Sequence, residues 1–283
     1  MRFLYTLVSA NIIIITAKQM TSFIPSATTT TTAVGVGVIL YIIIRKRNQK
    51  RKPVGFIFDL DGTLLDFEGA SHVALNAPLL RFANKHVDWR LHASISGTPA
   101  ATWSKEILNA LQITEMTPSE YAHEWHEHIK KAFPTMPLLP GALELVKKCR
   151  AYFPGAKLAI ATSSERINFD AKMSYHPELL QCFDIVVTGD EIPKGRGKPN
   201  PDIFLEAARR IQVDPKRCVV FEDAPSGALG GKRAGCMVVA IPDDRMIGNE
   251  GHIIDVADLI VKSLVEVDTK LLRKIYETLQ TTV

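Results

Sequence analysis

Two aspartates separated by one residue stand directly after a short apolar run. Asp59 and Asp61 follow residues 54–58 and precede Gly62. In an extended chain with a side-chain period of two, both carboxylates project to the same side, and Gly62 allows the chain to turn. Two carboxylates this close repel each other unless a cation lies between them. Mg²⁺, which takes one or two carboxylates together with phosphate oxygens, meets this need.

Further polar residues stand at the ends of other apolar runs or before a helical stretch. They are the acidic pair Glu222 and Asp223, the hydroxyl pair Thr162 and Ser163, and Lys198. Hydroxyl and backbone N–H groups at the start of a helix, together with one lysine, form a cradle for phosphate. A carboxylate nucleophile, a metal, a hydroxyl and a lysine together indicate phosphoryl transfer through an aspartyl-phosphate.

Alternating strands and helices must bring these residues together. Apolar runs predict buried strands at residues 54–58, 157–161, 185–188, 218–221 and 237–241. Stretches with helical periodicity lie between these runs, at residues 141–152, 201–211 and 226–234. This alternation predicts an α/β fold with a doubly wound parallel sheet covered on both faces. Ligands bind at the carboxyl edge of such a sheet, so we expect the polar residues to meet there.

Residues 69–137 interrupt the alternation with a helical insertion. Amphipathic helices are predicted at residues 74–85, 100–111 and 118–132. An insertion directly after the first strand lies above the ligand-binding edge of the sheet. We therefore expect a helical cap at 69–137 and a catalytic core made of residues 53–68 and 138–283.

The insertion also contains all three tryptophans and six of the eight histidines. Trp89, Trp103 and Trp125 predict the core of the cap rather than a stacking platform for a ligand. His123 and His126 share a helix face, but no third ligand is specified by the spacing. We therefore predict a solvated helix face there and no metal site.

Charge is divided unevenly along the 283 residues. Residues 1–52 hold eight of the 34 basic residues and no acidic residue, which leaves 26 basic against 30 acidic residues in the remainder. A nucleic-acid-binding body needs its own basic face, so we expect no nucleic-acid partner. The 46% hydrophobic and 23% charged residues are typical of a globular protein and exclude a disordered or polytopic membrane chain.

The first 52 residues predict a leader outside the globular part. Residues 27–44 carry no charge and are long enough for a short transmembrane helix. Six of the eight residues 45–52 are basic, which predicts that this flank stays in the cytosol. We expect a membrane anchor with the catalytic domain facing the cytosol. The alternative is an organelle-targeting leader for a plastid or mitochondrion that is later cleaved, because the segment is rich in serine and threonine and lacks acids.

Four motifs in this order resemble the haloacid dehalogenase-like superfamily of phosphohydrolases over residues 54–245. They are Asp59-Leu60-Asp61-Gly62-Thr63, Thr162 after an apolar strand, Lys198-Pro199 with Pro201-Asp202, and Glu222-Asp223. The resemblance implies that Asp59 is the nucleophile and Asp61 the general acid and base. It implies that Thr162, Ser163 and Lys198 bind the phosphate. It implies a Mg²⁺ cofactor held by Asp59, the Asp61 carbonyl and Asp223, with assistance from Glu222.

Further segments are similar to the pseudouridine-5′-phosphatase and glycerol-3-phosphatase branch of that superfamily. Among them are residues 133–135, 139–141 and 221–227, and the stretch Phe169-Asp170-x-Lys172. The cap loop and the residues after the Thr162 motif depart from the branch. Because these departures lie where the leaving group is read, we assign substrate specificity to Gly97, Thr98 and Arg166.

The sequence thus predicts a Mg²⁺-dependent phosphatase of small phosphate monoesters. Sugar, polyol and nucleoside phosphates qualify, among them glycerol 3-phosphate and pseudouridine 5′-phosphate. Two alternatives stay open: a sugar phosphomutase of the same superfamily, and a membrane-tethered binding protein without catalysis. We expect a monomer whose partner is a small phosphorylated metabolite and which contacts the membrane through the N-terminal anchor.

Overall fold

A computed structural model describes residues 53–96, 98–246, 253 and 255–281. The predicted anchor at 27–44 and the specificity residue Gly97 lie outside this part of the chain. Among the described residues, no helix has the length and apolar character needed to cross a bilayer.

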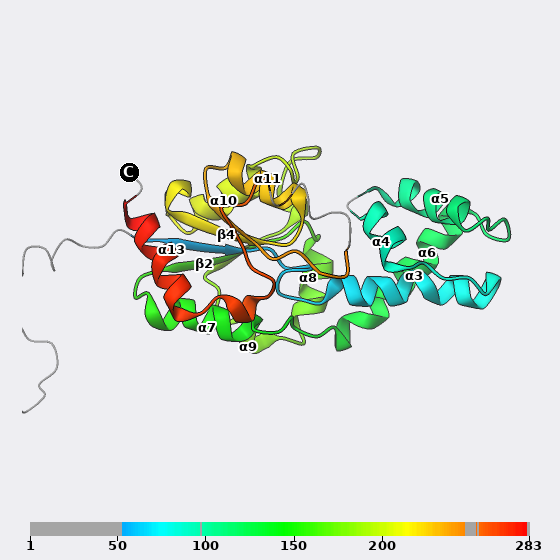
Figure 1. Cartoon of the computed structure of the whole chain (residues 1–283), viewed down its shortest axis with the longest axis horizontal. Coiled ribbons are helices and arrows are strands. Elements are labelled where there is room, and N and C mark those ends of the chain that lie inside the picture. The colour runs from blue at the N-terminus through cyan, green and yellow to red at the C-terminus, as the bar shows by residue number, and fades with distance from the viewer. Residues whose placement is uncertain (1–52, 97, 247–252, 254, 282–283) are drawn as a thin grey trace, which may run out of the picture. The chain divides into compact units, whose positions relative to one another are not determined.

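A parallel sheet forms the core, as predicted, and it has six strands (Figure 1). Its strands are β1 (Gly55–Phe58), β2 (Lys157–Ala161), β3 (Ile185–Val187), β4 (Cys218–Glu222), β5 (Met237–Ala240) and β6 (Leu259–Ile260). The order is β3-β2-β1-β4-β5-β6, with every neighbouring pair parallel. The sequence predicted all of these except β6, which is only two residues long and too short to produce a periodic pattern.

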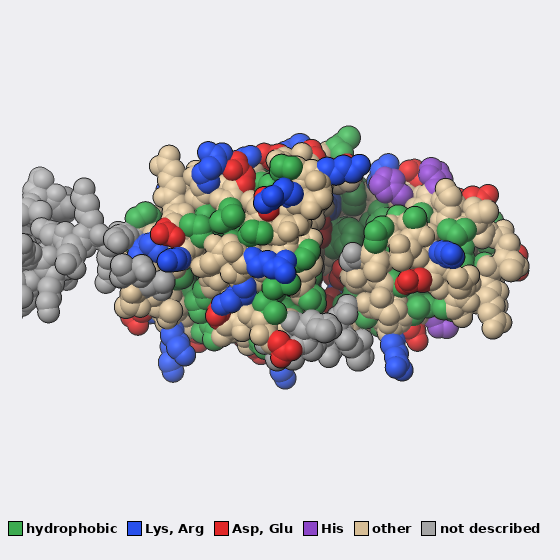
Figure 2. Space-filling view, turned by 90° about the horizontal axis from the view of Figure 1, so that it is seen from above, with side chains coloured by type: hydrophobic (Ala, Val, Ile, Leu, Met, Phe, Trp, Pro, Cys, Tyr) green, Lys and Arg blue, Asp and Glu red, His purple; other side chains and the backbone are tan. Residues whose placement is uncertain are grey.

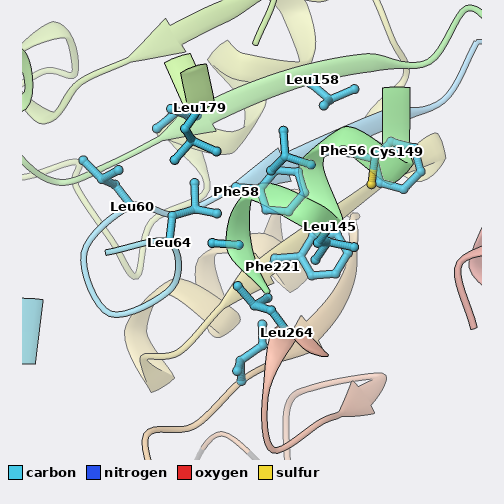
Figure 3. Close-up of a cluster of buried hydrophobic side chains, with 14 of the residues drawn as sticks. Phe56, Phe58, Leu60, Leu64, Leu145, Cys149, Leu158, Leu179, Phe221 and Leu264 are labelled. Atoms are coloured by element: carbon cyan, nitrogen blue, oxygen red, sulfur yellow. The ribbon is translucent and has the colours of Figure 1, made fainter. Parts of the chain in front are cut away.

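Alternate side chains of strands β1 to β5 enter two separate hydrophobic clusters, one on each face of the sheet. Phe56 and Phe58 of β1 belong to the first cluster, and Ile57 belongs to the second. Helices α7 (Ala142–Tyr152) and α13 (Thr269–Thr281) cover the first face; α10 (Asp202–Arg210) and α11 (Pro225–Arg233) cover the second. Figure 3 shows Phe56, Phe58 and Phe221 packed against Leu145 and Cys149 of α7. Burial on both faces explains why the strands are continuous apolar runs.

Three helices in the described part of the core were not predicted: α8 (Arg166–Met173), α9 (Pro177–Leu180) and α13. The buried residues of α13 are Leu272, Ile275, Tyr276 and Leu279. Their spacing of three and four residues is that of one helix face, so the sequence carries the amphipathic pattern of this helix. The two helices that follow β2 are short. Helix α8 contributes a side chain that contacts the candidate site.

Four helices occupy the inserted segment: α3 (Phe67–Ala83), α4 (Trp89–Ile95), α5 (Ala100–Ala110) and α6 (Pro118–Ala132). Their hydrophobic core includes Trp103, and Trp125 packs against it, as predicted. The Tyr121 hydroxyl of α6 donates a 3.0 Å hydrogen bond to the Leu75 carbonyl of α3. Trp89 instead stacks on His72, with 3.9 Å between ring centroids.

Helix α3 begins seven residues before its predicted start because Asp66 caps it. The Asp66 carboxylate accepts a 3.0 Å hydrogen bond from the Gly69 N–H, a typical N-cap interaction. A Cβ at position 69 would lie 2.6 Å from that carboxylate. A residue without a side chain therefore fits this position in the first helical turn. The insertion is joined to the core where the Asp66 N–H donates to the Pro137 carbonyl at 2.9 Å.

Histidine side chains lie on the surface of the inserted helices (Figure 2). His123 and His126 are exposed. No group of three or more histidine, cysteine or acidic residues that could hold a metal ion occurs in the described ranges. The exposure of these two histidines agrees with the solvated face predicted for this part of α6.

Candidate active site

The ends of β1 and β4 bring Asp59 beside Glu222. Phe58 pairs with Phe221 in the sheet, and the Asp59 N–H donates a 3.0 Å hydrogen bond to the Phe221 carbonyl. The next side chains along each strand therefore meet at the carboxyl edge. Sequence periodicity predicted two strand ends at this edge, and the parallel register places them next to each other.

Lys198 lies between these two carboxylates. Its Nζ donates to Asp59 Oδ1 and, at 2.6 Å, to Glu222 Oε1. The second oxygen of Glu222 accepts from the Ala224 N–H at 3.0 Å. All three side chains are less than a tenth exposed, so each charge depends on the others for compensation.

The buried carboxylates outnumber the lysine. Burial raises the pKa of Asp59 to about 7, although Lys198 acts in the opposite direction and Glu222 adds to the rise. Burial also raises the pKa of Asp223 well above its usual range, with further contributions from Glu222 and Asp59. Burial lowers the pKa of Lys198, but its two carboxylate partners outweigh this effect and keep the ammonium charged. Ionisation of both aspartates therefore needs a further positive charge, so the site favours a bound cation.

Asp223 faces the turn that follows the two aspartates of the first motif. The Thr63 hydroxyl donates a 2.7 Å hydrogen bond to Asp223 Oδ1. Gly62 has φ +90°, and a Cβ there would lie 2.3 Å from Asp223 Oδ2. Glycine is therefore required at this position both for its backbone conformation and for the close approach of the Asp223 carboxylate.

Asp61 has different partners from Asp59. Lys172 of α8 donates to Asp61 Oδ1 at 2.5 Å and to Oδ2 at 2.6 Å, and the Ser164 hydroxyl donates to Oδ2 at 2.6 Å. The sequence did not indicate either partner. Lys172 belongs to one of the branch-specific stretches, and this was the sequence feature that pointed to it. Helix α8 was not predicted, so the sequence did not indicate where this lysine lies.

A cavity of about 260 Å³ joins the predicted residues. It is lined by Asp59, Asp61, Thr162, Ser163, Lys198, Glu222 and Asp223, along with residues of the insertion and of the loop after β5. Thr162 is buried, and its hydroxyl oxygen accepts from the Ser164 N–H at 3.1 Å. Side chains from four strand ends or loops thus meet around one space.

The residues assigned to specificity do not line this cavity where they are described. Arg166 pairs with Glu191 at 2.8 Å, and the Thr98 hydroxyl donates to the Ile95 carbonyl at 2.7 Å. The cavity is lined instead by Ser96 of the insertion and by Glu68 of α3. Glu68 Oε2 lies 3.2 Å from His92 Nε2, a pairing that brings together residues 24 positions apart and could not be read from local spacing.

The residues present fit a magnesium ion. No three acidic, histidine or cysteine side chains in the described part of the chain form a complete metal cage. Mg²⁺ does not need one, because it is held by one or two carboxylates and completes its shell with water and substrate phosphate. Asp59 and Asp223 are two such carboxylates. The negative charge of each makes a nearby cation more favourable for the other.

Gly227 offers a test of the Lys198–Glu222 pair. A Cβ there would lie 1.6 Å from Glu222 Oε1, so we expect Gly227→Ala to displace Glu222 from Lys198. Crowding of this kind costs about 1–3 kcal/mol of stability, and we expect at least a ~10-fold fall in kcat/KM because Lys198 loses its fixed position. Thermal unfolding and phosphatase assays measure the two effects. Gly197→Ala is the matched control, since a Cβ there meets nothing within 4 Å; equal effects of the two variants would contradict the prediction.

Residues 54–235 match the family model of the haloacid dehalogenase-like hydrolases. The chain belongs to this family of hydrolases. Within it, the chain is a phosphatase of the branch indicated by its motifs. It is 38% identical over 215 residues to (DL)-glycerol-3-phosphatase 2 of Arabidopsis thaliana, covering 74% of this chain and 87% of that relative.

One further relative agrees with this assignment, and one solved structure shows the same fold. A Saccharomyces cerevisiae protein named "Probable pseudouridine-5'-phosphatase" is 31% identical over 194 residues, which are 66% of this chain and 81% of the relative. The crystal structure of β-phosphoglucomutase from Clostridium difficile shares the fold, with a TM-score of 0.59 and 21% identity over 80% of this chain and 97% of that one.

Proposed function

We propose that this enzyme hydrolyses small phosphate monoesters of sugars, polyols or nucleosides through an aspartyl-phosphate on Asp59. The observation that carries the proposal is the position of Lys198 Nζ, which bridges Asp59 and Glu222 in a buried cavity. A single buried lysine next to a carboxylate nucleophile stabilises the charge of a transferring phosphoryl group. Glycerol 3-phosphate and pseudouridine 5′-phosphate are the first substrates to test.

The two aspartates take separate roles in the proposed reaction. Asp59 attacks phosphorus, the bond from phosphorus to the leaving oxygen breaks, and Asp61 donates a proton to that oxygen. Water then attacks the aspartyl-phosphate while Asp61 accepts its proton, which releases phosphate and restores Asp59. Thr162, Ser163 and Lys198 hold the phosphate oxygens.

Asp59, Asp223 and the Asp61 carbonyl would hold Mg²⁺, which supplies positive charge to the phosphate oxygens when bound. We assign the assisting role of Glu222 to its contact with Lys198 rather than to direct contact with the metal. Both of its oxygens have protein partners, Lys198 and the Ala224 N–H. Glu222 therefore assists by orienting Lys198.

A substrate panel tests the proposal. The purified full chain is incubated with glycerol 3-phosphate, pseudouridine 5′-phosphate and hexose phosphates, and free phosphate is measured. We expect phosphate release from at least one substrate in Mg²⁺, a loss of at least ~10²-fold with a chelator, and recovery when Mg²⁺ is restored. Conversion of one hexose phosphate into another without phosphate release would identify a phosphomutase instead. No turnover of any substrate would favour the binding protein.

The cellular location follows from residues 1–52 in this proposal. We infer that residues 27–44 anchor the enzyme in a membrane and that the basic flank 45–52 keeps the catalytic core in the cytosol. A C-terminally tagged chain is expected to keep its full length and to resist extraction from membranes by alkaline carbonate. A shortened chain inside a plastid or mitochondrion would instead establish a cleaved leader.

A further inference from the structure

Lys172 is a buried lysine that the proposed reaction does not use directly. Its side chain is 1% exposed. The Nζ lies 5.3 Å from the centre of the Phe67 ring and 5.7 Å from that of Phe133. A lysine in such apolar surroundings is costly unless its charge and all its N–H groups are satisfied.

Three polar atoms accept hydrogen bonds from this ammonium group: the two carboxylate oxygens of Asp61 and the hydroxyl oxygen of Ser164. Lys172 Nζ donates to both Asp61 oxygens and, at 2.8 Å, to Ser164 Oγ. Ser164 in turn donates its own proton to Asp61 Oδ2. The three N–H groups of the ammonium are thus all used, and the Asp61 carboxylate is held at both oxygens.

The two carboxylates of the first motif are therefore held by two separate lysines. Lys198 holds Asp59 from the loop before α10, and Lys172 holds Asp61 from α8. Asp59 and Asp61 have opposite tasks, since one attacks phosphorus and the other transfers a proton at the leaving oxygen. Separate partners let each carboxylate keep its own direction within the same 260 Å³ cavity.

We propose that Lys172, with Ser164, is a positioning residue for the proton transfer by Asp61. The inference rests on the proposed function, in which Asp61 is the general acid. Lys172 does not touch the reacting atoms; it sets the direction of the Asp61 carboxyl group, whose protonated form delivers its proton to the leaving oxygen and becomes the carboxylate. A poorly placed acid loses much of the roughly 10²- to 10⁴-fold that such catalysis contributes.

Leaving groups of different basicity test this inference. An alkoxide such as that of glycerol 3-phosphate needs a proton as it departs, whereas p-nitrophenolate leaves without one. Because kcat/KM covers the steps up to departure of the leaving group, hydrolysis of the aspartyl-phosphate does not enter it. The quantity measured is the ratio of kcat/KM for glycerol 3-phosphate to kcat/KM for p-nitrophenyl phosphate, which does not depend on the folded fraction of the enzyme.

In Lys172→Met, which keeps an apolar chain against the two rings, we expect this ratio to fall at least ~10-fold. Lys172→Arg, which keeps the charge, is expected to recover part of it. Ser164→Ala is expected to lower the ratio less than Lys172→Met does. In an Asp61→Asn background, Lys172→Met is expected to change the ratio no further, because the acid it positions is absent.

Equal losses for both substrates in Lys172→Met would overturn the positioning role and leave only a structural one. If Lys172→Met does not fold, Ser164→Ala decides: a fall in the ratio supports the inference, and an unchanged ratio overturns it. If Asp61→Asn itself leaves the ratio unchanged, the general-acid role in the proposed function is wrong. The two failures are therefore distinguishable.

Discussion

Asp59→Asn is expected to reduce kcat by at least ~10³-fold with every phosphate monoester that the enzyme hydrolyses. The amide cannot attack phosphorus, so no covalent intermediate forms. Asn keeps the size of the side chain, and Lys198 keeps its bond to Glu222, so we expect the fold to remain intact. Steady-state phosphate release and acid-quench trapping of phosphorylated protein are the measurements. Retention of more than a few per cent of activity would reject Asp59 as the nucleophile.

The stability of the same variant gives an independent check. Asn resembles the protonated carboxyl, and the pKa of Asp59 is raised from 3.8 to about 7 in the folded protein. Ionisation of Asp59 therefore costs stability progressively as the pH rises from about 4 to 7, and the full cost persists above pH 7. Without Mg²⁺, the melting temperature of Asp59→Asn minus that of the unaltered protein should increase between pH 5 and pH 8. A constant or decreasing difference would show that burial does not disfavour the Asp59 charge.

Lys198→Met is expected to lower both stability and activity. It removes the positive partner of two buried carboxylates, and breaking a buried pair from one side costs about 3–5 kcal/mol. The loss of one preorganised positive charge at the transferring phosphate adds about a 10²- to 10³-fold fall in kcat. Denaturant unfolding in the absence of substrate and phosphate-release assays measure the two effects separately.

A second substitution separates the two roles of this lysine. In Lys198→Met with Glu222→Gln, one unpaired carboxylate becomes neutral, so we expect part of the stability to return while kcat stays low. Recovery of activity in this double variant would show that Lys198 acts only by neutralising Glu222. Activity of the single variant above a tenth of the original would contradict contact between Lys198 and the phosphate.

The local part of the site was predictable because it depends on short-range geometry. Asp59, Asp61 and Gly62 lie within one strand end and one turn, where a side-chain period of two and a glycine conformation suffice. The buried strands were predictable for the same reason, since burial on both faces of a parallel sheet requires continuous apolar runs. Together these features predicted that the acidic ends of β1 and β4 would lie at one edge.

Other parts of the fold were missed where their signal was short or came from a single side chain. Strand β6 has two residues, and α4 has seven with a cap supplied by Asp88. The start of α3 depends on Asp66 and on a glycine in the first turn, which resembles a break when read without the cap. Such features follow local rules, but the rules act over too few residues to outweigh their neighbours.

The sequence by itself determined the sheet, the family motifs and the residues that could do the chemistry. Only the tertiary structure decided which charged side chains pair with each other. Lys198 and Lys172 each contact one aspartate, 139 and 111 positions away along the chain. Arg166 pairs with Glu191 instead of lining the cavity, and Glu68 and Ser96 line it. These pairings depend on where α8, α10 and the inserted helices pack and on which buried charges lack water, and neither quantity is encoded in the spacing of residues along the chain.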